Sequence, residues 1–262
     1  MSAPKPVQFV DLDAARAARG LRIVVAGGVP SPWSEAAKGI FTVKGLDFVA
    51  VRKRPGDAEL ERWTGCTNAP VVMFDDEPAR SGWADILALG ERLGGAVSLL
   101  PESIADRALV LGLCHEILGE SGLVWSGRLL LIHSGLTTEG RAGFPPPVAQ
   151  YLAPKYGYAP ERTTHARQRV LALLGHLGSL ARAGREAGSR YLVGDRVSAV
   201  DIHLAAALNT LAPLPHDLCP MRPALRVAFE SVEPELRDAL GPELLEHRDF
   251  IYREHLGLPM EL

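Results

Sequence analysis

Two short apolar segments separated by one helix constrain the fold of this chain more than any other feature. Residues 21–26 read Leu-Arg-Ile-Val-Val-Ala, a β-branched run that predicts a buried strand. Glycines and a proline interrupt this run, and residues 33–43 then place apolar side chains at helical spacing. A second strand is predicted over residues 46–51. Because a helical crossover of this kind joins parallel strands, the segment predicts a β-α-β unit.

The same alternation continues to about residue 95. A polar segment that tolerates helix, residues 57–65, is followed by a third apolar strand at residues 71–74. The turn at residues 75–78 fits a hairpin, and residues 83–93 return to helical spacing. The first third of the chain therefore predicts the order β-α-β-α-β-β-α.

Beyond the glycine pair at residues 94–95, the pattern changes to helices almost throughout. Residues 140–160 are expected to be a loop with at most one or two helical turns near residues 148–152. Helices are predicted over residues 101–119, 122–133, 161–182, 198–211 and 242–255. The predicted fold class is an α/β N-terminal domain followed by an all-α C-terminal domain. The predicted boundaries are an N-terminal extension at 1–20, a first domain at 21–95 and a second at 96–262.

Composition excludes several classes of function. Lysine and arginine total 28 against 31 aspartate and glutamate, a net charge of −3, so non-specific binding of nucleic acid is not expected. No long apolar leader is present, and the apolar runs fall short of the roughly 18 residues of a membrane helix. Cys66, Cys114 and Cys219 lie far apart, which predicts reduced thiols in a cytoplasmic protein. The eight histidines form no ligand cluster, so no metal is expected.

Three motifs in register resemble the cytosolic glutathione transferase superfamily. Residues 28–34 read Gly-Val-Pro-Ser-Pro-Trp-Ser and are similar to the serine-type W-P-S-P-F turn of the tau class. Ala69-Pro70 stands before the third strand, where the superfamily has a cis proline. Residues 191–202 are similar to the superfamily's capping box and hydrophobic staple. The resemblance spans about residues 20–230 and implies a thioredoxin-like domain followed by an all-helical domain.

Ser31 precedes Pro32 at the turn between the first strand and the first helix. Its local sequence favours a helix N-cap with proline at the first helical position. The resemblance implies instead that its hydroxyl donates a hydrogen bond to the thiolate of bound glutathione, which lowers the pKa of that thiol together with the helix N-terminus. Ser34 stands where dithiol oxidoreductases carry their second cysteine, so disulfide exchange at this turn is excluded. Ser34 is expected to complete the cap.

Ala69 and Pro70 also have two interpretations. The local sequence permits an ordinary trans turn proline. The resemblance implies a cis bond that presents the backbone N–H and C=O of Ala69 to glutathione, which would pair with them as an added strand.

The superfamily's Glu-Ser pair at the next helix is absent, and the chain reads Arg80-Ser81-Gly82 there. These three residues are candidates to hold a carboxylate of glutathione; alternatively, Ser81 is only a cap and Arg80 only a solvated turn residue.

The remaining motifs are expected either to stabilise the fold or to bind the electrophile that would react with glutathione. Ser198-Ala-Val-Asp201 is a capping box, so Asp201 is predicted to be structural rather than catalytic. Trp63 and Trp83 are predicted to pack in the core rather than to contact a ligand. The resemblance places the electrophile site between the domains, and the candidates to line it are Trp125, His115, Tyr156 and Tyr158.

The resemblance implies a homodimeric, cytoplasmic glutathione transferase with a role in detoxification. Glutathione would be its cosubstrate, and Ser31 would stabilise the thiolate that attacks a small hydrophobic electrophile. Two alternatives stay open: a glutathione-dependent isomerase, reductive lyase or ether-cleaving enzyme on the same fold, or a non-catalytic ligand-binding protein. A nicotinamide-dependent dehydrogenase is not supported, because no G-x-G-x-x-G follows a strand.

Overall fold

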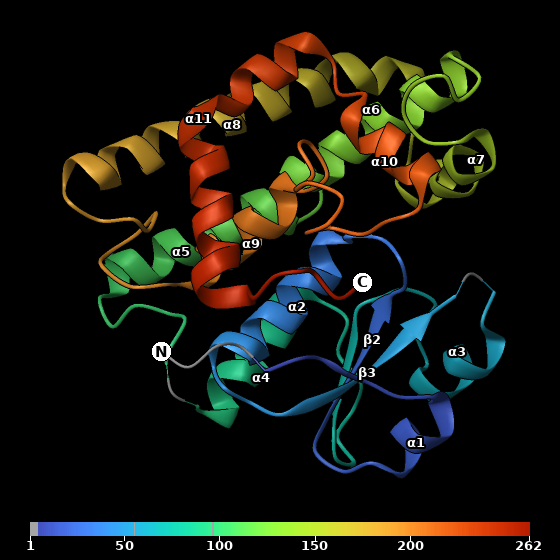
Figure 1. The fold of residues 1–262 in the computed structure, drawn as a ribbon, viewed down its shortest axis with the longest axis vertical. Coiled ribbons are helices and arrows are strands. Elements are labelled where there is room, and N and C mark those ends of the chain that lie inside the picture. Colours follow the sequence, from blue (N-terminus) through green and yellow to red (C-terminus); the bar gives the residue numbers. More distant parts are fainter. Residues whose placement is uncertain (1–4, 55, 96) are drawn as a thin grey trace.

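The computed structural model describes residues 5–54, 56–95 and 97–262 of the chain. A four-stranded sheet with its helices forms the first part of the molecule (Figure 1). In the second, larger part, every regular element within the described residues is helical. This arrangement confirms the predicted fold class, a thioredoxin-like α/β domain followed by an all-α domain.

The sheet has the strand order β1-β3-β2-β4. The parallel neighbours β2 (Leu21–Ala26) and β3 (Phe48–Lys53) pair along their whole length, and α2 (Pro32–Val43) connects them. The outer strand β4 (Val71–Phe74) runs antiparallel to β2. The predicted β-α-β unit is confirmed, with β3 beginning at Phe48 rather than at residue 46. The remaining helices beside this sheet are α3 (Ala58–Thr64) and α4 (Trp83–Leu93).

The N-terminal segment, expected to be an extension, contributes to the sheet. β1 (Gln8–Phe9) pairs in parallel with β3, and α1 (Leu12–Ala17) follows it. The Asp11 side chain accepts a hydrogen bond from the Ala14 N–H at 2.8 Å and so caps α1. A two-residue strand carries too few side chains to show an alternating pattern, which explains why the sequence did not predict it.

The second part differs from expectation at two helices that begin with proline. α7 occupies residues predicted to form mainly loop, and α10 was not predicted. Both have proline at the first helical turn, where the missing N–H removes no intrahelical bond, so proline content did not exclude a helix. α11 also begins earlier than expected and contains a kink at Gly241, whose φ of 56° is not helical. The helices of this part are α5 (Ile104–Leu118), α6 (Leu123–Thr137), α7 (Pro146–Lys155), the 3-10 turn η1 (Pro160–Arg162), α8 (Thr163–Glu186), α9 (Ala199–Leu208), α10 (Pro223–Glu230), α11 (Pro234–Ile251) and the π-helical turn η2 (Tyr252–Leu256).

α9 lies between the two parts of the molecule, and all of its residues are buried. It packs against α2, α5 and α11, so it joins the helical part to the α/β part (Figure 1). α2 approaches closely at Gly39, where a Cβ would lie 2.7 Å from Cγ2 of Ile202. At the α9 N-terminus, the buried Asp201 carboxylate accepts hydrogen bonds from the N–H groups of Leu192 and Ser198 and from the Ser198 hydroxyl. These bonds confirm the predicted structural role of Asp201.

One helical stretch, Ile104–Thr137, is long and apolar enough by length and composition to cross a membrane. The sequence had led us to expect none. The stretch comprises α5 and α6, which are separated by a short non-helical break. Half of its most apolar 18-residue segment is buried inside the protein, and the core helices of soluble proteins can be equally long and apolar.

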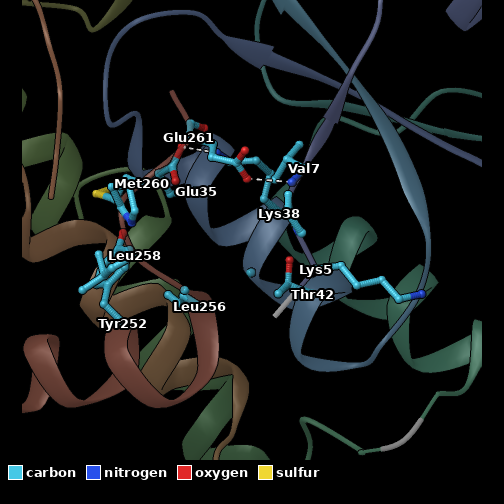
Figure 2. Close-up of a pocket in the computed structure, with 14 residues that line it drawn as sticks. Lys5, Val7, Glu35, Lys38, Thr42, Tyr252, Leu256, Leu258, Met260 and Glu261 are labelled. Carbon is cyan, nitrogen blue, oxygen red and sulfur yellow. Dashed lines mark hydrogen bonds and ion pairs between the residues drawn. The ribbon is translucent and has the colours of Figure 1, made fainter. Parts of the chain in front are cut away.

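A cavity of about 250 Å³ lies between α2, residues 5–7 and the C-terminal segment (Figure 2). Its polar wall contains a buried ion pair in which Lys38 Nζ lies 2.9 Å from Glu35 Oε1. The same ammonium donates a hydrogen bond to the Glu261 carbonyl at 2.6 Å, and Glu261 Oε2 accepts one from the Val7 N–H. Burial raises the pKa of Glu35, while the charge of Lys38 opposes that rise. The two ends of the described chain are thus joined beside α2.

Lys38→Met should lower the free energy of unfolding by about 3 to 5 kcal/mol, because it leaves the Glu35 carboxylate buried without its partner. The double variant Glu35→Gln/Lys38→Met removes both charges and should regain most of that loss. Denaturant unfolding near neutral pH measures both free energies. A double variant no more stable than Lys38→Met would show that the pair does not act through charge compensation.

Two buried histidines indicate a loss of stability in acid. Burial lowers the pKa of His203 to about 3 and the pKa of His247 to about 4. Both values lie below the unfolded value of 6.5, so the unfolded state binds more protons and stability falls as the pH falls through 6.5. Burial raises the pKa of Asp201 from 3.8 to about 6, so this carboxyl makes the stability rise as the pH falls. This gain is smaller than the loss that the two histidines cause together. Acid should therefore destabilise the fold through the histidines.

His203→Leu should reduce the loss of unfolding free energy between pH 7 and pH 5 by about 2 kcal/mol relative to wild type. His176 is exposed on α8, so His176→Leu supplies the matched control for replacing a histidine with leucine. Denaturant unfolding at several pH values measures the slope for each protein. An unchanged slope in His203→Leu would assign the acid sensitivity to other groups.

Candidate functional site

Ser31 ends the turn that joins β2 to α2. It has the extended conformation of a helix N-cap (φ −66°, ψ 117°), and Pro32 is the first helical residue. Its carbonyl accepts the Glu35 N–H at 2.8 Å, but its side chain makes no capping hydrogen bond. The predicted cap position is confirmed, whereas the predicted cap bond is wrong. The Ser31 hydroxyl is therefore uncommitted within the described residues, although the residue is only 8% exposed.

Ser34 lies in the first turn of α2 and is fully buried. Its hydroxyl accepts a hydrogen bond from the Ala26 N–H at 3.1 Å instead of completing the cap. This bond ties the first turn of α2 to the last residue of β2, and so it holds the turn that carries Ser31. The expected capping bond is wrong, but the structural role of Ser34 is confirmed.

The peptide bond between Ala69 and Pro70 is cis, as the resemblance implied. Pro70 is buried, and β4 follows it directly. Because β4 runs antiparallel to β2 and Val71 pairs with Val24, the start of β4 lies beside the C-terminal end of β2. The Ala69 backbone is thus at the same end of the sheet as Ser31. Within the described residues, the Ala69 N–H and C=O make no backbone hydrogen bond.

The start of α4 lacks the serine cap that the sequence predicted. Gly82 occupies the N-cap position, and Trp83 is the first helical residue. Ser81 is exposed and lies one residue too early, so its predicted capping role is wrong. Asp85, which was not predicted, lies in the first turn, with Oδ2 3.0 Å from the position that a Cβ would take at Gly82. Its spacing of three residues from the N-cap is the sequence signal that indicates it.

Arg80 is held within the hairpin that precedes α4. Its backbone N–H and C=O pair with Val72 in a single antiparallel bridge, so the predicted turn folds back on β4, but the further strand in the predicted order is wrong. Its guanidinium donates to Glu77 at 2.6 Å, and Arg92 binds the same carboxylate. Hydrogen bonds from Arg92 and then from Arg80 lower the pKa of Glu77. The charge of Arg80 is therefore already paired. This agrees with the alternative in which Arg80 is only a residue of the turn and does not bind glutathione.

Aromatic side chains gather next to the turn that carries Ser31. The ring centroids of Trp33 and Trp125 lie 6.2 Å and 4.7 Å, respectively, from that of Tyr156. The Trp33 Nε1–H donates a hydrogen bond to the Leu118 carbonyl at 2.8 Å, which orients the indole. Two of the four candidates for the electrophile site, Trp125 and Tyr156, are thus brought together beside the first turn of α2.

The other aromatic candidates make different contacts. The Tyr158 hydroxyl lies 2.9 Å from His133 Nδ1. The exposed His115 has its ring centroid 6.4 Å from that of Trp83, which is itself packed against the main core. Trp63 packs against the smaller hydrophobic cluster beside α3. These contacts confirm the predicted packing roles of Trp63 and Trp83.

The cavity shown in Figure 2 does not contain the predicted site residues. Among the residues that the structure describes, no group of three or more His, Cys, Asp or Glu side chains could hold a metal ion. The groups with unused hydrogen-bonding capacity at this end of the sheet are the Ser31 hydroxyl, the Ala69 backbone and the N-terminus of α4. Together they offer hydrogen-bond donors and an acceptor to a polar ligand at this end of the sheet.

The two serines of the turn should differ in their contribution to stability. Ser34→Ala removes the acceptor of the Ala26 N–H and should lower the free energy of unfolding by about 1 to 3 kcal/mol. Ser31→Ala removes a hydroxyl that has no protein partner and should change it by less than about 0.5 kcal/mol. Denaturant unfolding of both variants under the same conditions compares them. Equal losses would contradict the availability of the Ser31 hydroxyl to a ligand.

No family model matches the sequence, and no curated protein matches it. Solved structures match at low sequence identity. A glutathione S-transferase domain-containing protein from Marinobacter aquaeolei is 18% identical, with a TM-score of 0.61 over 90% of this chain and 100% of that chain. A glutathione S-transferase from Methylobacterium radiotolerans, solved with glutathione sulfonate, is 18% identical, with a TM-score of 0.57 over 90% and 92% of the two chains. The β-etherase LigF from a Sphingobium strain is 16% identical, with a TM-score of 0.54 over 88% and 99%.

Proposed function

We propose that this chain, which has the glutathione S-transferase fold, binds glutathione and stabilises its thiolate with the hydroxyl of Ser31. The observation that carries the proposal is the uncommitted Ser31 hydroxyl at the N-terminus of α2, at the same end of the sheet as the cis peptide of Ala69 and Pro70. A hydroxyl that capped the helix would be unavailable to a ligand. The M. radiotolerans protein of the same fold was solved with glutathione sulfonate, which supports glutathione as the ligand.

In the proposed reaction, the thiol of glutathione loses its proton to solvent, and Ser31 donates a hydrogen bond to the thiolate. This bond and the partial positive charge at the α2 N-terminus lower the thiol pKa from its ordinary value of about 8.5. The thiolate sulfur forms a bond to an electrophilic carbon, and the leaving group departs with the electron pair of the broken bond. The protein forms no covalent intermediate, because it contributes ionisation and proximity.

The rest of glutathione would bind along β4 and the start of α4. The Ala69 N–H and C=O would pair with the extended cysteinyl backbone. The N–H groups at the start of α4, together with Ser81 and Gly82, would bind the γ-glutamyl carboxylate, and Asp85 would bind the γ-glutamyl amine. Asp85 would thus replace the acid of the superfamily's Glu-Ser pair. Arg80 would take part only if it left Glu77.

The second substrate would be a small electrophile that packs on the rings of Trp33, Trp125 and Tyr156.

The proposal includes a homodimer, a cytoplasmic location and a role in detoxification. Ile104 and Leu109 on α5 are 85% and 42% exposed, and apolar surface of this kind supports contact with a second copy. The three cysteines are free, which fits a reducing compartment.

Two alternatives have support in particular observations. The likeness of fold to a β-etherase supports a glutathione-dependent lyase or isomerase, which product analysis with each electrophile class would separate from conjugation. The paired charge of Arg80 and the exposed, non-capping Ser81 support a non-catalytic binding protein that does not hold glutathione. Tight glutathione binding with thiolate formation would oppose this second alternative.

Calorimetric titration of glutathione between about pH 6 and pH 8.5 tests the proposal. Wild type should bind with a dissociation constant below about 1 mM and release a proton, because the site lowers the thiol pKa. Ser31→Ala should bind with similar affinity but release the proton only at higher pH. S-methylglutathione, which has no thiol proton, is the matched control ligand.

Two results would contradict the proposal in different ways. No heat with glutathione at millimolar concentration would remove glutathione as the ligand and favour the binding-protein alternative. Binding with the same proton release in wild type and Ser31→Ala would keep glutathione but remove Ser31 from the stabilisation of its thiolate.

A further inference from the structure

Basic residues from four separate elements lie near the turn that carries Ser31 or near the aromatic group beside it. We call them the basic cluster. Its members are Lys53 at the end of β3, Arg128 on α6, Lys155 at the end of α7 and Arg222 at the N-cap of α10. The chain as a whole carries a net charge of −3, so this concentration of positive charge is a local property of the site.

Arg128 occupies the centre of the aromatic group beside α2. Its guanidinium carbon lies 5.5 Å from the ring centroids of Trp33, Phe144 and Tyr156. The residue is half-buried, and within the described residues it makes no ion pair and no side-chain hydrogen bond. Contacts with ring faces compensate a cation only in part, so the guanidinium keeps its capacity to bind an anion.

Arg222 approaches the same turn from the N-terminus of α10. Its Nε and Nη2 atoms lie 3.8 Å and 3.9 Å from the position that a Cβ would take at Gly28. Gly28 has a φ of 69°, which favours glycine, and it is separated from Ser31 by only two residues. Arg222 is exposed, and it takes part in no ion pair among the described residues. Its guanidinium therefore lies near the turn and has no ion-pair partner among the described residues.

Lys155 and Lys53 complete the cluster. Partial burial lowers the pKa of Lys155, and the positive charges of Arg128 and then Lys53 lower it further. Lys53 is next to the turn, because the Gly27 N–H donates to its carbonyl at 3.4 Å. Lys53 is paired with Glu61 at 2.7 Å, whereas Lys155 forms no ion pair among the described residues. Two of the four cations, Arg128 and Arg222, thus lie beside this turn and form no ion pair among the described residues.

Like charges held together repel, and this repulsion is relieved when an anion binds between them. The rings of Trp33, Trp125 and Tyr156 lie next to Arg128, so aromatic groups and a cation occur at the same place. We propose that the acceptor substrate is an aromatic electrophile with a carboxylate or similar acidic group, which the basic cluster binds while its ring packs on Trp33 and Tyr156. This inference rests on the proposed function, and it replaces an uncharged hydrophobic acceptor with an acidic one.

Binding of two unreactive ligands, an acid and its uncharged methyl ester, tests the proposal. Calorimetry compares 3-nitrobenzoate with methyl 3-nitrobenzoate on the full chain, with and without saturating S-methylglutathione. The acid should bind at least about tenfold more tightly than the ester, a difference of about 1.4 kcal/mol. The acid should also bind when S-methylglutathione is present. An ester that binds as tightly as the acid would overturn the proposal.

Substitutions test whether the basic cluster causes the preference for the acid over the ester. Arg128→Met keeps an unbranched side chain among the three rings and should remove most of the tenfold preference for the acid. Arg222→Met changes an exposed residue and should reduce the preference by several-fold even if Arg128→Met folds poorly. Arg253→Met is the matched control, because Arg253 is exposed on η2 and outside the cluster. An equal loss of preference in Arg253→Met and Arg222→Met would overturn the assignment.

The outcomes with S-methylglutathione separate this proposal from the proposed function. Competition between S-methylglutathione and the acid would mean that the cluster holds a carboxylate of glutathione, and this would overturn the proposal but not the proposed function. Binding of the acid without any binding of S-methylglutathione would leave an acid-binding site and overturn both the proposed function and the acceptor role.

Turnover then tests the acceptor role itself, with 4-chloro-3-nitrobenzoate and its methyl ester as the pair. In each case the thiolate sulfur bonds to the ring carbon that carries chlorine, and chloride leaves with the electron pair. Each kcat/KM is divided by the uncatalysed rate constant, which corrects for the different reactivity of the two rings. The corrected value should be at least about tenfold higher for the acid in wild type, and this ratio should fall by several-fold in Arg222→Met. A higher corrected value for the ester in wild type would overturn the acceptor role.

Discussion

The burial of α9 is the constraint on which both parts of this molecule depend. All of its residues are buried, so water cannot satisfy the backbone groups at its N-terminus, and the Asp201 carboxylate takes that role together with Ser198. Through α9 the helical part is held against α2, at a separation that Gly39 permits. Because Ser31 begins α2, the same packing determines how the candidate site lies relative to α6 and α7.

The candidate site differs from its surroundings in having polar groups that the fold does not use. Ser34 and Arg80 have the same side-chain chemistry as Ser31 and Arg128, but each already has a partner in the protein. The Ser34 hydroxyl accepts a hydrogen bond from the Ala26 N–H, and the Arg80 guanidinium donates one to Glu77. The Ser31 hydroxyl and the Arg128 guanidinium have no such partner within the described residues. Ser31 is buried and Arg128 is half-buried, so both groups lose part of their hydration without gaining a partner. A ligand that supplies partners is therefore bound more favourably here than at the serines and arginines already paired.

The elements that could be predicted are those whose signal lies in neighbouring residues. The run 21–26 and the helical spacing of 33–43 produced the β-α-β unit, because strand and helix periods are local properties. β1 could not be predicted, since its two residues become a strand only by pairing with β3. At the site, the position of Ser31 and the cis bond before Pro70 were predicted. The cap at Ser81 was wrong because Gly82 takes that position, and Asp85 was overlooked.

The sequence by itself determined the order β-α-β-α-β over residues 21–74, the capping box at Asp201 and the lack of a second thiol at the Ser31 turn. These features depend on residue type and on spacing over a few positions. Only the tertiary structure decided that Trp33, Trp125, Tyr156 and Arg128 meet beside Ser31, and that Arg222 reaches Gly28 from α10. The physical reason is that these contacts join residues far apart in the chain. The packing of helices around α9 brings them together, and no local pattern encodes that packing.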